Sequence, residues 1–252
     1  MHHQVRTAED VRALRTDRAA ELAYVARAIQ KVATHFRDRL GIIGFCGAPY
    51  TLASYMVEGG GSKNYIHTKQ MMYRDTLSWR LLLDKIVKVL EDYCRLQVQA
   101  GADVIQVFDS WVGSLGLADY RDYAFEASKR LVRAVQQMGV PVIYFGVETA
   151  GLLSQMASTG ADVIGLDWRQ PLDEGWRSVG HGHAVQGNLD PITLFAPLEV
   201  LELRVKEILR AANGRPGHIF NLGHGIVPGT PVENVQAVVR MVKEFRLEAA
   251  HG

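Results

Sequence analysis

Short apolar runs alternate with longer amphipathic segments along most of the chain. The runs predict buried strands at residues 40–45, 101–108, 141–145, 161–166, 184–186 and 218–222. Apolar residues recur at helical spacing in residues 22–36, 68–100, 119–138, 198–212 and 232–247. Strands alternating with helices predict parallel βαβ units, and strands that are apolar on both faces indicate a sheet covered on both sides.

A repeated turn favours a closed barrel over an open sheet. The sequence GADVI occurs at residues 101–105 and again at 160–164, where Gly ends a helix and Asp opens a strand. We count six βα units, and the first helix precedes any strand. The sequence therefore predicts an α/β fold, a TIM-type (β/α)8 barrel with about six units present and the first two missing. Two strand edges would then be unpaired.

Composition narrows the class of function. The chain has 252 residues, of which 48% are hydrophobic, and a net charge of +1. No linker or charge block divides it, so residues 1–252 are expected to form one domain. The near-zero charge argues against a nucleic-acid or membrane partner. Cys46 and Cys94 form no CxxC motif, which argues against a structural zinc site. No signal peptide or membrane span is recognisable, so a cytoplasmic location is expected.

Polar residues follow the predicted strands, where a βα barrel places its active site. The candidates are Tyr55 after the first strand, Ser110 after the second and His224 after the last. Each has a structural alternative. Tyr55 is equally consistent with a half-buried aromatic residue, and Ser110 or the adjacent Asp109 with a helix cap. His224 lies between two glycines that expose its ring, which favours a functional role.

Five segments in order resemble the uroporphyrinogen decarboxylase family: GFCGAPYTLASYMVEGGGSKNY, VFDSWVGSLG, GLDW, QGNLDP and NLGHGIVP. The resemblance extends over essentially the whole chain. It implies a TIM-type barrel that acts as a homodimer without metal or organic cofactor. It also implies a reaction in which four acetate side chains of uroporphyrinogen lose carbon dioxide to give coproporphyrinogen. Such an enzyme holds a polyanionic macrocycle, stabilises a pyrrole-derived cation and supplies protons.

The resemblance also assigns roles to the candidate residues. Tyr55 and Ser110 match substrate-contacting hydroxyls of the family, and Tyr55 would lie near a reacting acetate. His224 matches a histidine that binds a substrate carboxylate, and Phe45 an aromatic residue lining the cleft. Tyr55 is thus the expected catalytic residue, and Tyr55, Ser110, His224 and Phe45 are the expected substrate contacts.

The sequence departs from the family pattern in one respect. The family begins with an Arg-Gln-Ala-Gly-Arg motif, followed by an aspartate that binds the pyrrole NH groups, and neither is found in this chain. Asp109 is the carboxylate closest to the expected cleft, but the family does not use that position. The 252-residue chain is therefore expected to be impaired by itself.

Two other functions remain open. Related methyltransferases with corrinoid or thiol substrates share the barrel, but they bind zinc through a His-x-Cys pair and a later Cys. Here the corresponding strand leads into QGNLDP, and neither cysteine has a nearby His partner in the sequence. The chain is also consistent with a non-catalytic fragment that binds porphyrins or pairs with another subunit.

Overall fold

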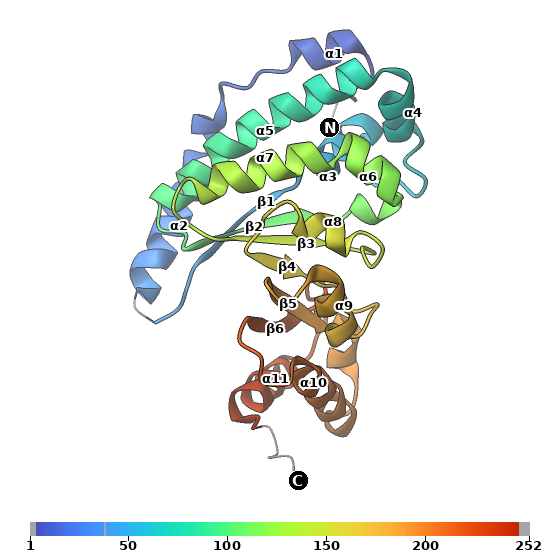
Figure 1. Cartoon of the computed structure of the whole chain (residues 1–252). Coiled ribbons are helices and arrows are strands. Elements are labelled where there is room, and N and C mark those ends of the chain that lie inside the picture. Colours follow the sequence, from blue (N-terminus) through green and yellow to red (C-terminus); the bar gives the residue numbers. More distant parts are fainter. Residues whose placement is uncertain (1–3, 38, 247–252) are drawn as a thin grey trace.

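The computed structural model describes residues 4–37 and 39–246 and contains one parallel sheet. Six strands follow one another in chain order from one edge to the other (Figure 1). The strands are β1 (Ile43–Gly47), β2 (Val104–Asp109), β3 (Val142–Gly146), β4 (Val163–Gly165), β5 (Ala184–Leu189) and β6 (His218–Leu222). Within the described residues, β1 and β6 each pair with a single neighbour, so both ends of the sheet have a free edge.

Helices connect the strands and follow the outside of the curved sheet (Figure 1). The α-helices are α1 (Ala8–Ala13), α2 (Ala23–Phe36), α3 (Pro49–Glu58), α4 (Ile66–Arg74), α5 (Thr76–Gln99), α6 (Leu117–Tyr123), α7 (Phe125–Gln136), α8 (Leu153–Ala157), α9 (Leu172–Val179), α10 (Leu198–Ala212) and α11 (Val232–Glu244). The 3₁₀ turns are η1 (Ala19–Leu22), η2 (Val112–Ser114) and η3 (Pro191–Phe195). Figure 1 shows α5 and α7 beside β1 to β3, and α10 and α11 beside β6.

Strand residues alternate between the helical layer and the concave side of the sheet. In β2, Ile105 and Val107 are fully buried in the core that the sheet forms with the helices. Gln106 and Phe108 point the other way and line a cavity. The carboxyl ends of the strands thus carry two sets of side chains, one in the core and one on the concave face.

The expected fold class is confirmed. All six expected strands form, all are parallel, and the units follow one another as in a TIM-type barrel. The helix expected at residues 22–36 corresponds to α2, that at 198–212 to α10, and that at 232–247 to α11, which ends at Glu244. Residue 247 lies outside the described residues.

Several helix boundaries differ from the expectation. The segment 68–100 is two helices, because Asp75 leaves helical geometry (φ −138°) and its side chain accepts a hydrogen bond from Ser78 N–H. The segment 119–138 is likewise divided, into α6 and α7 at Ala124. Helices α1, α3, α8 and α9 were not expected. Helix α3 starts at Pro49, whose fixed φ suits a first helical position, and its small and hydroxyl-bearing residues hide the helical pattern.

Candidate active site

A cavity of about 420 Å³ lies on the concave side of the sheet, near the carboxyl ends of β2, β3, β5 and β6. Its volume falls in the range of small-molecule sites, roughly 300–1,000 Å³. Two expected site residues, Ser110 and His224, line it together although they follow different strands. The other lining residues are Gln106, Phe108, Phe145, Gln186, Asn221, Leu222, Gly225 and Ile226.

Aromatic rings form a continuous row along the concave face. Phe45 meets Phe108 edge to face with ring centroids 6.0 Å apart, and Phe108 meets Phe145 in the same way at 5.8 Å. The His224 ring continues the row, 6.3 Å from Phe145 and 6.2 Å from Trp168. Phe45 is 60% exposed, so the row is apolar but open to solvent at the β1 edge. Such a wall suits the faces of a flat aromatic or pyrrolic ligand.

Two buried amides provide the polar floor of the cavity. Gln106 on β2 and Gln186 on β5 are both buried, and Gln186 Nε2 donates a hydrogen bond to Gln106 Oε1 over 3.3 Å. The bond joins strands that are not neighbours in the sheet. His224 is the one titratable side chain among the ten lining residues of the cavity. A carboxylate bound at this wall would therefore meet neutral donors and His224.

Tyr55 lies beside this cavity rather than in its lining. It sits near the end of α3, which stops at Gly59 with φ +84°, a conformation that glycine adopts without strain. The Tyr55 ring stacks on Trp111, with centroids 3.7 Å apart and an angle of 22° between the planes. Because Trp111 directly follows Ser110, the stack connects Tyr55 to the edge of the cavity. Tyr55 remains 42% exposed.

Tyr65 also contacts the Trp111 ring that stacks on Tyr55. Its ring meets Trp111 edge to face at 5.3 Å, and its backbone is left-handed (φ 51°, ψ 40°) at the start of α4. Ser62 Oγ accepts a hydrogen bond from the Tyr65 N–H over 3.0 Å. Burial raises the pKa of the Tyr65 hydroxyl, and the nearby Glu148 carboxylate raises it further. Tyr65 therefore keeps its proton at neutral pH.

Asp109 does not line the cavity, and its carboxylate also interacts with the backbone of Thr51 in the first turn of α3. It is fully buried in the helical layer, where it accepts hydrogen bonds from Thr51 Oγ1 and from the Tyr144 hydroxyl, each over 2.7 Å. Tyr144 OH also lies within hydrogen-bonding distance of Ser128 Oγ (3.1 Å) and Tyr120 OH (3.2 Å). Burial raises the pKa of Asp109 to about 6, although hydrogen bonds from the Thr51 side chain, the Tyr144 hydroxyl and the Thr51 backbone oppose that shift. The alternation of β2 explains this orientation, since Ser110 takes the concave side.

A charged cluster borders the cavity beyond His224. Arg169 forms ion pairs with Asp167 Oδ2 at 3.0 Å and Glu148 Oε1 at 3.2 Å, and its guanidinium lies 4.2 Å from the centre of the Trp168 ring. Glu148 has a left-handed backbone (φ 60°), and its N–H donates to Asp167 Oδ2. The two carboxylates hold Arg169 against Trp168, and the Trp168 ring also meets the His224 ring edge to face.

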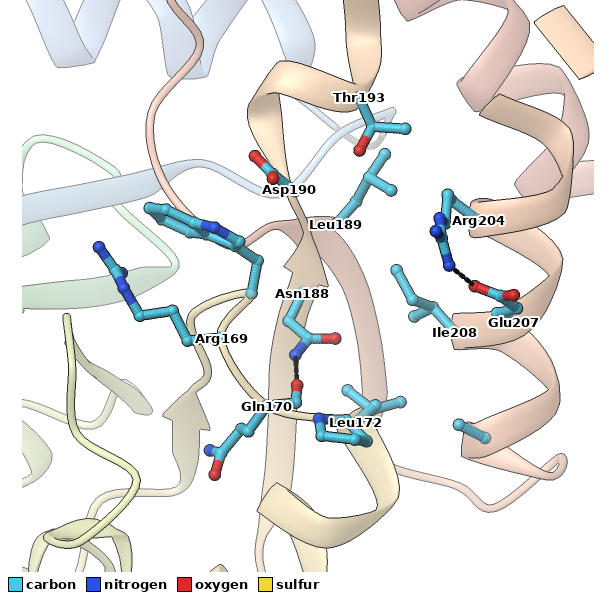
Figure 2. Close-up of a pocket in the computed structure, with 13 residues that line it drawn as sticks. Arg169, Gln170, Leu172, Asn188, Leu189, Asp190, Thr193, Arg204, Glu207 and Ile208 are labelled. Atoms are coloured by element: carbon cyan, nitrogen blue, oxygen red, sulfur yellow. Dashed lines mark hydrogen bonds and ion pairs between the residues drawn. The ribbon is translucent and has the colours of Figure 1, made fainter. Parts of the chain in front are cut away.

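A larger cavity of about 550 Å³ lies between the loop after β4, the end of β5 and α10 (Figure 2). Figure 2 shows Arg204 and Glu207 paired on α10 and the Asn188 amide bonded to the Gln170 carbonyl. Four of its polar lining residues thus bind one another in pairs, and neither Ser110 nor His224 lines it. We therefore regard the smaller cavity as the candidate active site despite its volume.

Comparisons with known proteins place this chain in a family. The sequence model of the family described as uroporphyrinogen decarboxylase (URO-D) matches residues 1–245. The chain belongs to the uroporphyrinogen decarboxylase family. Two curated relatives of that name, from Koribacter versatilis and Solibacter usitatus, are 56% and 51% identical to it. Each alignment covers 96% of this chain, and the chain spans 69% and 70% of the two relatives.

Solved structures share the fold beyond the family. A methyltransferase from Methanosarcina mazei aligns with a TM-score of 0.75 and 25% identity, over 87% of this chain and 63% of that one. A B12-independent methionine synthase from Shewanella aligns with a TM-score of 0.64 at 11% identity.

In the described part of this chain, no group of three His, Cys, Asp or Glu side chains is placed to hold a metal ion. No described helix is long and apolar enough to cross a membrane.

The structure brings most of the expected uroporphyrinogen decarboxylase site together. Ser110 and His224 line one cavity, and Phe45 joins it through Phe108. Tyr55 does not line the cavity; it stacks on Trp111, the residue that follows Ser110. Sequence reasoning gave no role to Gln106, Gln186, Phe108, Phe145 and Trp111. A glutamine inside the apolar run of β2 was a usable signal, because a buried amide needs a partner.

Proposed function

We propose that this chain forms the substrate wall of a uroporphyrinogen decarboxylase active site. The supporting observation is the shared cavity of Ser110 and His224, bordered by aromatic rings, in a chain that belongs to this family. The reaction would remove carbon dioxide from the four acetate side chains of uroporphyrinogen and give coproporphyrinogen.

The proposed chemistry needs a proton donor and a way to hold charge. Protonation of a pyrrole carbon makes a cation, and the electron pair of the breaking carbon–carboxylate bond flows into it as carbon dioxide leaves. A second proton then adds to the side-chain carbon in place of the carboxylate, and the first proton leaves the pyrrole carbon, so that the aromatic ring is restored and one proton is consumed for each carbon dioxide released. The aromatic row would hold the macrocycle, and Ser110 and His224 would bind carboxylates. Tyr55, on the exposed side of its stack, would contact the reacting acetate.

Further parts of the proposal concern the setting of the enzyme. We propose a homodimer in the cytoplasm that works without a metal or organic cofactor and that binds neither nucleic acid nor membrane. A net charge of +1 gives no general field for polyanions, so the substrate would be held by local groups such as His224.

The activity test uses the 252-residue chain under anaerobic conditions with uroporphyrinogen, followed by separation of the oxidised products by carboxylate number. One arm contains the chain alone. The other adds the segment of the Koribacter relative that the alignment leaves uncovered. We expect products with seven to four carboxylates in the second arm and fewer in the first. No product in either arm, from folded protein, would contradict the proposed function.

Single substitutions then test the proposed roles in the active arm. Tyr55→Phe removes one hydroxyl and is expected to lower kcat by about a hundredfold, the usual loss when a transition-state hydrogen bond disappears. His224→Ala is expected to raise KM, since it removes a carboxylate partner. His181→Ala changes an exposed histidine outside the cavity lining and should leave both constants unchanged. Equal effects of the two histidine variants would count against His224 as a substrate ligand.

A further inference from the structure

Trp111 holds Tyr55 and Thr51 at the same time. Thr51 and Tyr55 are four residues apart on α3, so their side chains lie on one face of that helix. The Trp111 ring stacks on the Tyr55 ring at 3.7 Å, while the Trp111 backbone N–H donates to Thr51 Oγ1 over 3.2 Å. Two different parts of one residue therefore contact two successive turns of α3.

The contact to Thr51 is anchored inside the protein. The Thr51 hydroxyl accepts from Trp111 and donates its own proton to Asp109 Oδ1 over 2.7 Å. Asp109 is fully buried and Thr51 is 5% exposed, so water does not compete for these bonds. Tyr144 on β3 holds the second carboxylate oxygen. A continuous chain of hydrogen bonds thus links α3 to β2 and β3.

Tyr55 itself has little else to fix its ring. Tyr55 is 42% exposed, whereas Thr51 and Asp109, which interact with the backbone of Trp111 directly or through Thr51, are buried. An exposed ring on the last turns of a helix samples several rotamers unless a neighbour restricts it. Trp111 is that neighbour, and Tyr65 restricts Trp111 in turn from its edge.

We propose that Thr51 and Trp111 are positioning residues for Tyr55, with Asp109 as their buried anchor. The inference rests on the proposed role of Tyr55 as a substrate contact. Thr51 and Trp111 would affect the reaction only by fixing the position of the Tyr55 hydroxyl. The alternative is ordinary packing, in which they stabilise the fold with no particular effect on Tyr55.

We call the contacts of Trp111 with Thr51 and Tyr55 the Trp111 clamp. A spectroscopic experiment tests this clamp independently of activity. The chain contains four tryptophans, so labelling with 5-fluorotryptophan gives four fluorine NMR signals, and Trp111→Phe identifies the signal of Trp111. We expect Thr51→Val, which has the same shape without a hydroxyl, to shift or broaden that signal. Thr51→Ser retains the hydroxyl and should leave it in place. An unchanged Trp111 signal in Thr51→Val would overturn the clamp.

The remaining three tryptophan signals report whether the fold survives. If Thr51→Val perturbs all four signals, Thr51→Ala replaces it, because the smaller side chain cannot clash in the buried site. Tyr55→Leu removes the stacked ring and is expected to shift the Trp111 signal alone. A Trp111 signal that keeps its position and width in both Thr51→Ala and Tyr55→Leu would overturn the proposal.

A kinetic cycle tests the link to the reaction in the active preparation. Thr51→Val is expected to lower kcat about tenfold with little change in KM, since a misplaced catalytic group costs rate rather than affinity. In a Tyr55→Phe background the same substitution should cost less than about twofold, because the hydroxyl it positions is gone. Thr51→Ser should restore the rate in the Tyr55 protein. Equal losses in both backgrounds would refute the positioning role.

The spectroscopic and kinetic experiments together distinguish a failure of the clamp from a failure of the proposed function. A confirmed clamp with equal kinetic losses would show that Tyr55 is held but that the positioning does not serve the reaction. A protein without any decarboxylase activity would contradict the proposed function and leave the fluorine signals to decide on the clamp. An unchanged Trp111 signal would refute the clamp whatever the activity.

Discussion

Asp109 shows how far one residue can depart from the interpretation of its sequence position. It follows a strand directly before Ser110, which suggested a carboxylate near the cleft or a helix cap. The pleat of β2 turns it into the helical layer, where it is completely buried. Its hydrogen bonds from Thr51 and Tyr144 favour the charged form, but burial outweighs them and raises its pKa to about 6.

This pKa predicts a pH-dependent stability. The folded pKa of about 6 exceeds the usual 3.8, so the contribution of Asp109 is fully present below about pH 4 and is lost as pH rises through 6. The loss is about 3 kcal/mol at neutral pH. Asp109→Asn does not titrate. Urea unfolding at several pH values should therefore show the wild type losing about 3 kcal/mol relative to Asp109→Asn between about pH 4 and pH 7.

The comparison needs a control at the same charge change. Asp92→Asn removes the same charge from a partly exposed carboxylate that pairs with Lys88, and it should change the free energy of unfolding by less than about 1 kcal/mol. A flat difference for Asp109→Asn would show that Asp109 is ionised in the folded protein without a penalty.

For single residues, a position directly after a predicted strand was the sequence feature that best predicted the cavity lining. It found Ser110 and His224, because parallel strands gather their carboxyl ends at one rim. It could not find Gln106 or Phe108, since strands that are apolar on both faces do not reveal which face is concave. It could not find Trp111 either. Its partner Tyr55 lies 56 positions earlier, on a helix that the sequence did not predict.

At the scale of elements, strands were easier to predict than helix boundaries. Runs of β-branched and aromatic residues place all six strands, with β5 continuing beyond the expected residues 184–186 to Leu189. Gly187 and Asn188 hide this extension because both residues are rare in strands. The short helices α8 and α9 have too few turns for a periodic pattern to stand out.

A side-chain amide from α5 supports the edge strand β1. Gln97 is 1% exposed, accepts a hydrogen bond from Phe45 N–H and donates one to Phe45 C=O, each over 2.9 Å. Gln97→Leu would leave both backbone groups without these partners. We expect it to lower the free energy of unfolding by about 1–3 kcal/mol. Gln99→Leu, at an exposed position of the same helix, should change it by less than about 0.5 kcal/mol.

Denaturant unfolding of the two glutamine variants measures the difference. Hydrogen exchange at the Phe45 amide adds a local reading, since Gln97→Leu should accelerate it while Gln99→Leu should not. Equal stabilities of the two variants would indicate that water replaces the Gln97 amide at the edge strand at no cost.

For the whole molecule, the repeat of βα units predicted both the class and the count. Six units in chain order build an arc whose helices lie outside (Figure 1). The position of the cavity could not be predicted from that count. It depends on side chains from β2, β3, β5 and β6 that meet only in three dimensions, as the Gln106–Gln186 bond illustrates. One domain over residues 1–252 remains a prediction.

The edges of the arc lead to a prediction about association. Within the described residues β1 and β6 are edge strands, and Ile43 and Ile219 on them are 49% and 43% exposed. Unpaired backbone next to apolar side chains favours pairing between copies, and lysine at such an edge opposes it. We expect sedimentation velocity of the 252-residue chain to show species larger than a dimer that grow with concentration. Ile219→Lys should remove them, whereas Leu77→Lys, at an 81% exposed position on α5, should not. Loss of the large species in both variants would mean that added charge, and not the strand edge, controls association.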